Sequence, residues 1–255
     1  MIALLSPAKT LDFNPASTSS HTQPRLLPRS EELVGILRDK PKEELMSLMS
    51  ISEKLASLNQ ARYESYQTPF TLDNAKQALL AFKGDVYAGM QAEDFTEEEL
   101  QYAQQHIRIL SGLYGLLRPL DLMQPYRLEM GTKLKNEHGK NLYEFWGGDI
   151  TRLINEDLRG NSSPAVINLA SKEYFSALNT EALSGPLYNV DFKEYRDGKY
   201  KIIAIYAKKA RGMMARYMVR NQLEEPEQLK GFNMDGYIFN DELSGERDFI
   251  FTRES

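Results

Sequence analysis

Apolar and polar positions change their spacing several times along this chain, and each spacing indicates a different element. Ile2–Leu5 is a continuous apolar run that ends at Ser6 and Pro7, which is typical of a buried strand followed by a loop. Ala165–Leu169 is a second short and mainly apolar run. We therefore predict two short buried strands, far apart in the sequence.

Helical spacing dominates the stretch that follows the first strand. The pattern predicts helices over Ser30–Arg38, with Ser30 as N-cap, over Pro41–Met49, with proline in the first turn, and over Asn59–Tyr66. Another helix is expected to open at Thr71 and to run through Leu80.

The proline-bearing segment Asn14–Pro28 is too polar for a core element, so it is expected to be an ordered surface excursion.

The central part of the chain mixes both periods. Ala81–Tyr87 is predicted to be a strand, and Thr96 begins a capping box for a helix that runs toward Ile107–Leu110, where the spacing becomes ambiguous. Tyr126–Met130 alternates weakly, and Asn141–Arg159 has helical spacing.

Two hairpins are predicted near the carboxyl end. Leu187–Tyr195 and Lys199–Tyr206 alternate on either side of an Asp-Gly turn, a helix follows over Ala207–Gln222, and Gly236–Phe251 contains the second hairpin. Strands and helices interleave without a regular βαβ rhythm. The sequence therefore predicts a mixed α/β or α+β fold in a single domain, 1–255, rather than a doubly wound sheet.

Composition excludes several kinds of chemistry. The chain has 255 residues, no cysteine and three histidines that lie far apart, so thiol peroxidases, disulfides, iron–sulfur clusters and histidine-built metal sites are not expected, and we predict no metal and no cofactor. No apolar run approaches the roughly 20 residues of a membrane span, and no signal peptide precedes the first strand. We therefore expect a cytoplasmic protein without a membrane partner.

Charge is distributed unevenly. The net charge is -5, yet residues 193–220 carry nine lysines and arginines against two acids, whereas residues 91–100 carry five acids and no base. On the helix predicted over Ala207–Gln222, Lys209, Arg216 and Arg220 share a narrow arc, and Gly212 beside it would let a backbone approach. Such a face suits phosphates. The alternative is a solvated face over a methionine-rich core.

Two loops that follow predicted strands have the composition of anion sites. Lys9 and Thr10 follow the first strand, where ligands commonly bind in sheets of this kind, and Lys83 and Asp85 repeat the pattern. If the strands are neighbours, Lys9 and Lys83 converge. The alternative is an ordinary surface lysine, since the spaced glycines of a P-loop are missing. Candidate acids or bases for an enzyme are Lys9, Asp12, Asp85 and Asp121, provided that the fold brings them together.

The segment 108–131 places Arg118 and Arg127 around two prolines. Guanidinium groups on a structured loop hold phosphates or carboxylates bidentately. Alternatively the two arginines pair with Asp121 and Glu129 and fix the loop.

Residues 43–66 have the pattern of a helical hairpin. Leu55–Asn59 occupies the place of the turn in a helix-hairpin-helix module, which contacts DNA phosphates through backbone amides, and Gln60 and Arg62 open the next helix. Both glycines of that turn are missing, and Ser57 and Asn59 stand in for them. A plain helical hairpin is the alternative.

Together these motifs resemble the YaaA family of bacterial peroxide-stress-response proteins over essentially the whole chain. The resemblance implies a protein that limits oxidative damage and free iron during hydrogen peroxide stress, with a mixed fold, a positively charged cleft, a helix-hairpin-helix element and the ability to bind DNA. It is carried by Ser6–Asp12, Ala81–Tyr87, Leu110–Gly115 through Arg118–Asp121, Gln124–Gly131, Ile167–Ser171 and Tyr206–Gly212.

Three hypotheses of function follow. The first is binding of double-stranded DNA without sequence preference. The second is an enzyme that acts on a small phosphorylated or nucleotide-like ligand held by Lys9 and Lys83. The third is an interaction of the acidic segment 93–99 with iron-handling proteins, against a plain capped helix. For the first, the predicted phosphate contacts are Lys9, Ser57, Asn59, Gln60, Arg62, Lys83, Arg118, Arg127, Lys208, Lys209, Arg211, Arg216 and Arg220.

Overall fold

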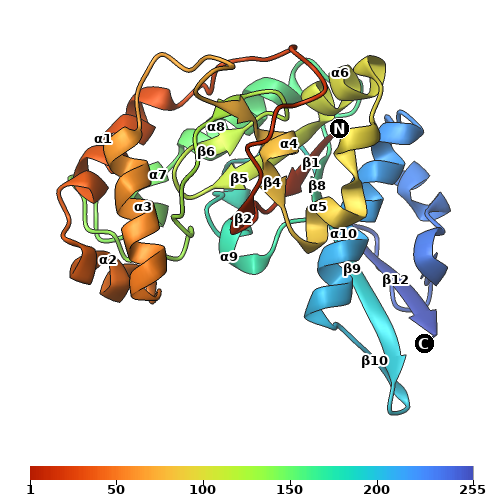
Figure 1. The fold of residues 1–255 in the computed structure, drawn as a ribbon. Coiled ribbons are helices and arrows are strands. Elements are labelled where there is room, and N and C mark those ends of the chain that lie inside the picture. Colours follow the sequence, from red (N-terminus) through yellow and green to blue (C-terminus); the bar gives the residue numbers. More distant parts are fainter. Residues whose placement is uncertain (255) are drawn as a thin grey trace.

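The computed structural model describes residues 1–254 and builds them around one large sheet whose central strands are parallel (Figure 1). β1 pairs with β5 on one side and with β8 on the other, both in parallel register. Every residue of β1 and β5 is buried, as expected for parallel strands that are covered on both faces. In order across the sheet, the parallel strands are β12 (Asp248–Glu254), β9 (Leu187–Arg196), β8 (Val166–Asn168), β1 (Ile2–Leu5) and β5 (Ile107–Ser111).

Antiparallel strands lie at the edges of this sheet. β6 (Gly115–Leu117) pairs with β5, and β11 (Ile238–Phe239) pairs with β12. β10 (Lys199–Lys201) pairs with the outer part of β9 in a hairpin that projects from the molecule (Figure 1). At its turn Asp197 and Gly198 have φ angles of 51° and 76°, the left-handed conformation that Asp-Gly adopts readily. Both predicted hairpins are confirmed, but the strand predicted over Lys199–Tyr206 ends at Lys201, and the following helix begins at Ala204 rather than Ala207.

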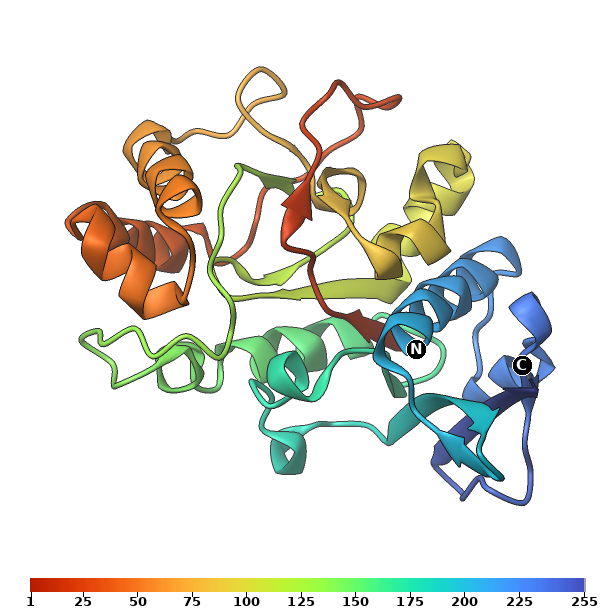
Figure 2. The ribbon, with the colours of Figure 1, turned by 60° about the horizontal axis from the view of Figure 1, so that its bottom comes forward.

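Helices cover both faces of the sheet (Figures 1 and 2). Three of them form a separate group at one end, shown in red and orange, and α5, α6 and α10 lie on the face opposite α7 and α8. The helices are α1 (Leu27–Arg38), α2 (Lys42–Met49), α3 (Glu53–Ser65), α4 (Ala78–Ala81), α5 (Asp85–Met90), α6 (Glu97–His106), α7 (Leu142–Trp146), α8 (Asp149–Leu158), α9 (Lys172–Phe175) and α10 (Ala204–Arg220).

Short elements complete the chain, and one hydrophobic core runs through it. Two small antiparallel pairs join β2 (Thr10–Leu11) to β4 (Phe82–Lys83) and β3 (Lys76–Gln77) to β7 (Leu122–Met123). Buried apolar side chains from Met1 to Phe251 form a single cluster, which agrees with the predicted mixed α/β class. The 3₁₀ helices are Ala92–Asp94, Thr180–Ala182, Pro226–Gly231 and Met234–Gly236.

Several predicted boundaries are wrong. Ser30 is not an N-cap: it lies inside α1, and its Oγ donates to Leu26 O. The predicted strand Ala81–Tyr87 is reduced to β4, because Gly84 has a φ of 133° and turns the chain directly into α5. The predicted helix Thr71–Leu80 is also wrong, since only α4 is helical there.

Other expectations are corrected or confirmed locally. The helical stretch Asn141–Arg159 is two helices, because Gly147 has a φ of 46° and separates α7 from α8. Residues 126–130 form no strand. The capping box at Thr96 and Glu99 is present at the start of α6, and Ile107 begins a strand rather than continuing that helix.

Candidate anion-binding pocket

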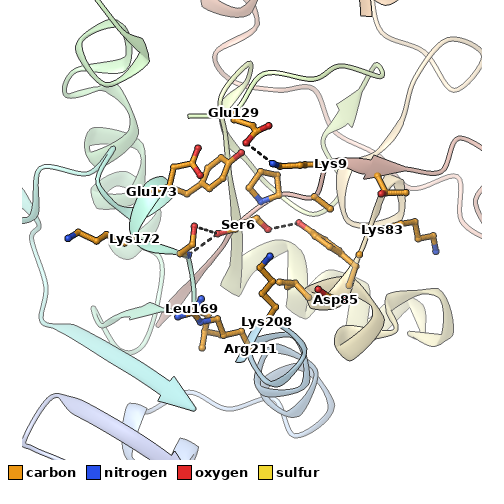
Figure 3. A pocket seen from close by; sticks show the side chains of 18 residues that line it. Ser6, Lys9, Lys83, Asp85, Glu129, Leu169, Lys172, Glu173, Lys208 and Arg211 are labelled. Carbon is orange, nitrogen blue, oxygen red and sulfur yellow. Dashed lines mark hydrogen bonds and ion pairs between the residues drawn. The ribbon is translucent and has the colours of Figure 1, made fainter. Parts of the chain in front are cut away.

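A cavity of about 550 Å³ opens where β1 and β8 end, and we call it the β1–β8 pocket (Figure 3). The carboxyl ends of parallel strands are the usual ligand sites of open α/β sheets, which was the reason to expect a site after β1. Five separate parts of the chain meet there. The lining residues are Ser6–Thr10, Lys83–Tyr87, Glu129, Leu169, Ser171–Tyr174, Lys208 and Arg211.

Ser6 ties the loops of the pocket together. The backbone N–H of Ser171 donates to Ser6 Oγ at 2.8 Å, which joins the loop after β8 to the loop after β1. The Tyr87 hydroxyl donates to Ser6 O at 3.1 Å and attaches α5 to the same point. The pocket wall is therefore a hydrogen-bonded unit assembled from three distant segments.

Lys9 and Lys83 both line the pocket, so the two residues come together as predicted, although Figure 3 shows their side chains pointing in different directions. The cause is the pairing of β2 with β4, which sets Thr10 opposite Lys83. Lys9 Nζ lies 2.8 Å from Glu129 Oε2, and Lys83 Nζ lies 4.0 Å from Asp12 Oδ2. Both ammonium groups thus already have a carboxylate nearby.

α10 contributes Lys208 and Arg211 to the pocket. Lys208 is exposed and forms no ion pair within residues 1–254. Arg211 has one distant partner, Asp191 Oδ1 at 3.5 Å, and its buried Nε has no hydrogen-bond partner in that part of the chain. Burial lowers the pKa of Arg211, although Asp191 opposes this effect. On the α10 side of the pocket, Lys208 is therefore without an ion pair in the described residues and Arg211 is only weakly paired.

Gly212 of α10 lets another helix approach, and not a phosphate as predicted. A Cβ on Gly212 would lie 1.7 Å from Val86 O, and a Cβ on Gly89 would lie 2.1 Å from Lys209 O. The backbones of α5 and α10 therefore touch at these two glycines. The approach that we predicted for a phosphate is taken by α5, and it sets Lys208 beside the loop 83–87.

The outer half of α10 is neutralised by the acidic segment. Arg216 and Arg220 donate to Asp94 Oδ1 at 2.8 and 2.7 Å, and Arg220 also donates to Glu99 Oε1 at 2.6 Å. Both guanidinium groups lie over the ring of Phe95. The structure thus pairs these predicted phosphate contacts with carboxylates and gives the acidic segment an internal partner.

Lys209, which was predicted to share a face of the helix with Arg216 and Arg220, has a different carboxylate partner. Its Nζ lies 3.8 Å from Asp235 Oδ2, and its side chain stays half exposed. It does not line the pocket.

Arg118 and Arg127 pair with carboxylates, which was the alternative to phosphate binding. Arg118 donates to the fully buried Asp121 at 2.9 Å, and Arg127 donates to Glu129 Oε1 at 3.1 Å. Neither arginine lines the β1–β8 pocket. Arg127 acts on it indirectly, because its partner Glu129 is the residue that holds Lys9.

The predicted turn at Leu55–Asn59 is wrong. α3 runs unbroken from Glu53, because the Ser52 side chain accepts the N–H of Leu55 and caps the helix there. α2 and α3 form a plain hairpin whose turn lies at Ser50–Ser52, with Ser50 in the left-handed conformation. The four predicted contacts in this segment lie inside α3, where the backbone amides serve the helix: Ser57, Asn59, Gln60 and Arg62.

Only some of the predicted acid and base candidates lie in the β1–β8 pocket. Asp85 lines the pocket with Lys9 and has no ion pair in the described part of the chain. Asp12 lies behind Lys83, outside the lining, and the backbone N–H of Asn14 lowers the pKa of its carboxyl group. Asp121 is buried against Arg118 and is remote from the pocket lining.

Sequence reasoning missed the far wall of the pocket. Glu129, Lys172, Glu173 and Tyr174 line it, and none of them was named as a candidate. The last three follow β8, a strand that was predicted, so its carboxyl end was the available signal. Glu129 had no local signal beyond its neighbour Arg127.

The described residues contain neither a metal-binding cluster nor a membrane-spanning helix. No group of three or more histidine, aspartate or glutamate side chains within residues 1–254 is arranged to hold a metal ion. No helix in the same range is both long and apolar enough to cross a membrane.

Comparison with protein families agrees with the motifs gathered around the pocket. The family model described as "Peroxide stress protein YaaA" matches residues 1–243, which include every residue that lines the β1–β8 pocket. The chain belongs to the YaaA family of peroxide stress proteins.

Proposed function

We propose that this peroxide stress protein acts by binding a phosphate-bearing ligand in the β1–β8 pocket. The observation that carries the proposal is the meeting of Lys208, which has no ion pair within residues 1–254, with Arg211, whose buried Nε has no hydrogen-bond partner there, in a pocket at the carboxyl ends of two parallel strands. An ammonium group and a guanidinium group with free donors are the side chains that bind phosphate in proteins. A cytoplasmic location belongs to the same proposal.

The charges of the pocket favour a ligand of modest charge. Five cations line it against the three carboxylates of Asp85, Glu129 and Glu173. The positive excess is therefore only two charges. A monophosphate or a phosphodiester therefore fits better than a triphosphate.

Titration calorimetry with inorganic phosphate, ribose 5-phosphate and AMP tests this proposal. Lys208→Ala is expected to weaken binding of all three at least fivefold, since a charge-assisted hydrogen bond contributes about 1.5–3 kcal/mol. Lys54→Ala is the matched control, because Lys54 is an exposed lysine of α3 far from the pocket lining. Equal binding by both variants would contradict the proposal.

Turnover of that ligand is a second part of the proposal. Asp85 supports it, because it is the candidate acid or base that lines the pocket without an ion pair in the described chain. Asp85→Asn is then expected to retain binding and to lose product formation. Retained turnover in this variant would remove Asp85 from any mechanism.

Binding of duplex DNA is a second candidate function. It is supported by the exposed cations Arg196, Lys199, Lys208 and Lys209, which follow one another from the projecting hairpin to the start of α10. They would let a duplex lie along this edge with the β1–β8 pocket as part of a positively charged cleft. We leave the amides of α3 out of this interface, because they are used within the helix.

Fluorescence anisotropy across a salt series tests the DNA proposal. The logarithm of the affinity should fall with that of the salt concentration, with a slope of about -0.9 per neutralised phosphate. Lys199→Glu with Lys208→Glu should flatten the slope, whereas Lys40→Glu with Lys54→Glu in the α1–α3 group should leave it unchanged. Salt-insensitive binding would rule this function out.

A further inference from the structure

We infer that the ligand of the β1–β8 pocket is a single nucleotide unit with a guanine base, whose phosphate lies at Lys208 and Arg211 and whose base edge lies at Glu173 and Lys9. This inference rests on the proposed phosphate binding and adds to it the identity of the rest of the ligand. It is carried by the separation of charges across the pocket.

The two ends of the pocket carry different groups. Figure 3 shows Lys208 and Arg211 on one side of Ser6, with Asp85 beside Lys208, and Glu173, Glu129 and Lys9 on the other side. A ligand that spans the pocket must therefore present an anion to α10 and hydrogen-bond donors to the opposite wall. Inorganic phosphate alone would leave the Glu173 side without a partner.

The wall between these ends is largely apolar. Pro7, Val86 and Leu169 line it together with the rings of Tyr87 and Tyr174. Most small-molecule sites combine such a surface with a few polar groups at fixed places, in volumes of roughly 300–1,000 Å³. At about 550 Å³ the pocket has room for one nucleotide, and the apolar stretch suits the flat face of a base and its sugar.

Glu173 is held in place for recognition. The backbone N–H of Gly131 donates to its Oε1 at 2.9 Å, and the Tyr143 hydroxyl donates to its backbone carbonyl at 2.9 Å. A Cβ on Gly131 would lie only 3.2 Å from that Oε1, so the carboxylate rests directly against the backbone. A fixed acceptor of this kind selects donors by position rather than by charge alone.

Guanine matches this wall better than the other bases. Its N1–H and N2–H donate side by side to one carboxylate, and its O6, next to them, accepts from an ammonium group such as that of Lys9. Uracil and thymine place two carbonyl oxygens around a single N–H, and a carboxylate repels both. Adenine and cytosine offer one amino group without an adjacent ring N–H. Their affinities should therefore lie between that of guanine and those of uracil and thymine.

Calorimetry with GMP, UMP and ribose 5-phosphate tests the inference on the intact chain. We expect GMP to bind at least tenfold more tightly than UMP, because a bidentate contact to a base discriminates by about 1–3 kcal/mol. Glu173→Gln should reduce this ratio below about threefold and leave ribose 5-phosphate unchanged, since the amide can still accept from Gly131. Glu181→Gln, an exposed glutamate outside the pocket lining, should keep the wild-type ratio.

The outcomes separate this inference from the proposed function. Equal affinities for GMP, UMP and ribose 5-phosphate, all lost in Lys208→Ala, would overturn the guanine assignment and leave phosphate binding standing. Absence of binding by any of the three would overturn both.

A further comparison distinguishes the source of the nucleotide. A short thymidine strand with one central guanine should bind more tightly than an all-thymidine strand, and its affinity relative to free GMP tells whether the unit comes from a strand or from solution. Equal affinity of the two strands, with no preference for free GMP over UMP, would contradict guanine recognition.

Discussion

The two halves of α10 carry similar charges and use them in opposite ways. At its inner half Lys208 and Arg211 face the β1–β8 pocket with little neutralisation, whereas at its outer half Arg216 and Arg220 are bonded to Asp94 and Glu99. The charge of the sequence alone does not tell these halves apart. What separates them is whether the fold brings a carboxylate to each cation, and four changes would break or sharpen this comparison.

The largest loss of stability is expected where α10 crosses α5. Gly212→Ala places a Cβ 1.7 Å from Val86 O, against backbone that cannot move aside without shifting a helix. Overpacking of this kind costs about 3 kcal/mol or more. Chemical denaturation would measure the loss in the free energy of unfolding.

A glycine in open space provides the control for that change. Gly35 lies within α1, and nothing lies within 4 Å of a Cβ added there. Gly35→Ala should therefore stabilise by about 0.5–1 kcal/mol, as expected in a helix interior. If Gly212→Ala were as well tolerated as Gly35→Ala, the α5–α10 contact would be looser than described.

Removal of a neutralised cation should have the next largest effect. Arg216 also donates to the carbonyls of Met90 and Gln91, so Arg216→Ala leaves several acceptors without a donor. We expect a loss of about 2 kcal/mol in unfolding free energy with ligand binding unchanged. Arg152→Ala, an arginine with two surface ion pairs, should cost less than about 1 kcal/mol. Lost ligand binding in Arg216→Ala would contradict the assignment of this half.

The outer half should also respond to acid. The hydrogen bond from Arg216 lowers the pKa of Asp94 below its usual 3.8. A carboxylate with a lowered pKa stabilises the fold fully above the unfolded value, and this stabilisation is lost as pH falls through the folded value. The stability difference between wild type and Asp94→Asn should therefore be fully present above pH 3.8, decline below it, and vanish once the pH has fallen through the lower pKa of the folded state. A difference that grows in acid would contradict the pairing.

The smallest effect on stability is expected at the inner half. Lys208 is exposed and forms no ion pair within residues 1–254, so Lys208→Ala should change the free energy of unfolding by less than about 0.5 kcal/mol. Its thermal midpoint without ligand should match wild type. The shift that ligand produces in wild type should be largely lost, which is the reverse of the pattern for Arg216→Ala.

Local chemistry explains which parts of the fold could be predicted. The Asp-Gly hairpin, the Thr96 capping box and the buried strands at Ile2–Leu5 and Val166–Asn168 depend on neighbouring residues, and all are present. The start of α3 was missed because a turn was predicted at Leu55–Asn59 and the helix was predicted to begin at Asn59. Ser52 accepts a backbone N–H, while Asn59 is buried and donates to Leu55 O within the helix.

The candidate site could be predicted only where it follows a strand. Lys9 and Lys83 were found because their loops leave strands, and β2 and β4 then bring them together. The fate of Arg216 could not be predicted, since its partner Asp94 lies 122 positions earlier. Glu173 follows a strand that was predicted, so its position after that strand was the available signal.

The close approach of α5 and α10 at Gly89 and Gly212 also has a consequence for binding kinetics. Two backbones that touch directly leave no side chain whose rotamer could adjust, so Lys208 and the loop 83–87 are held at one spacing before any ligand arrives. Association would then require no rearrangement of this wall. The ligand should enter in a single concentration-dependent phase, and variants at Lys208 should change the rate at which it leaves.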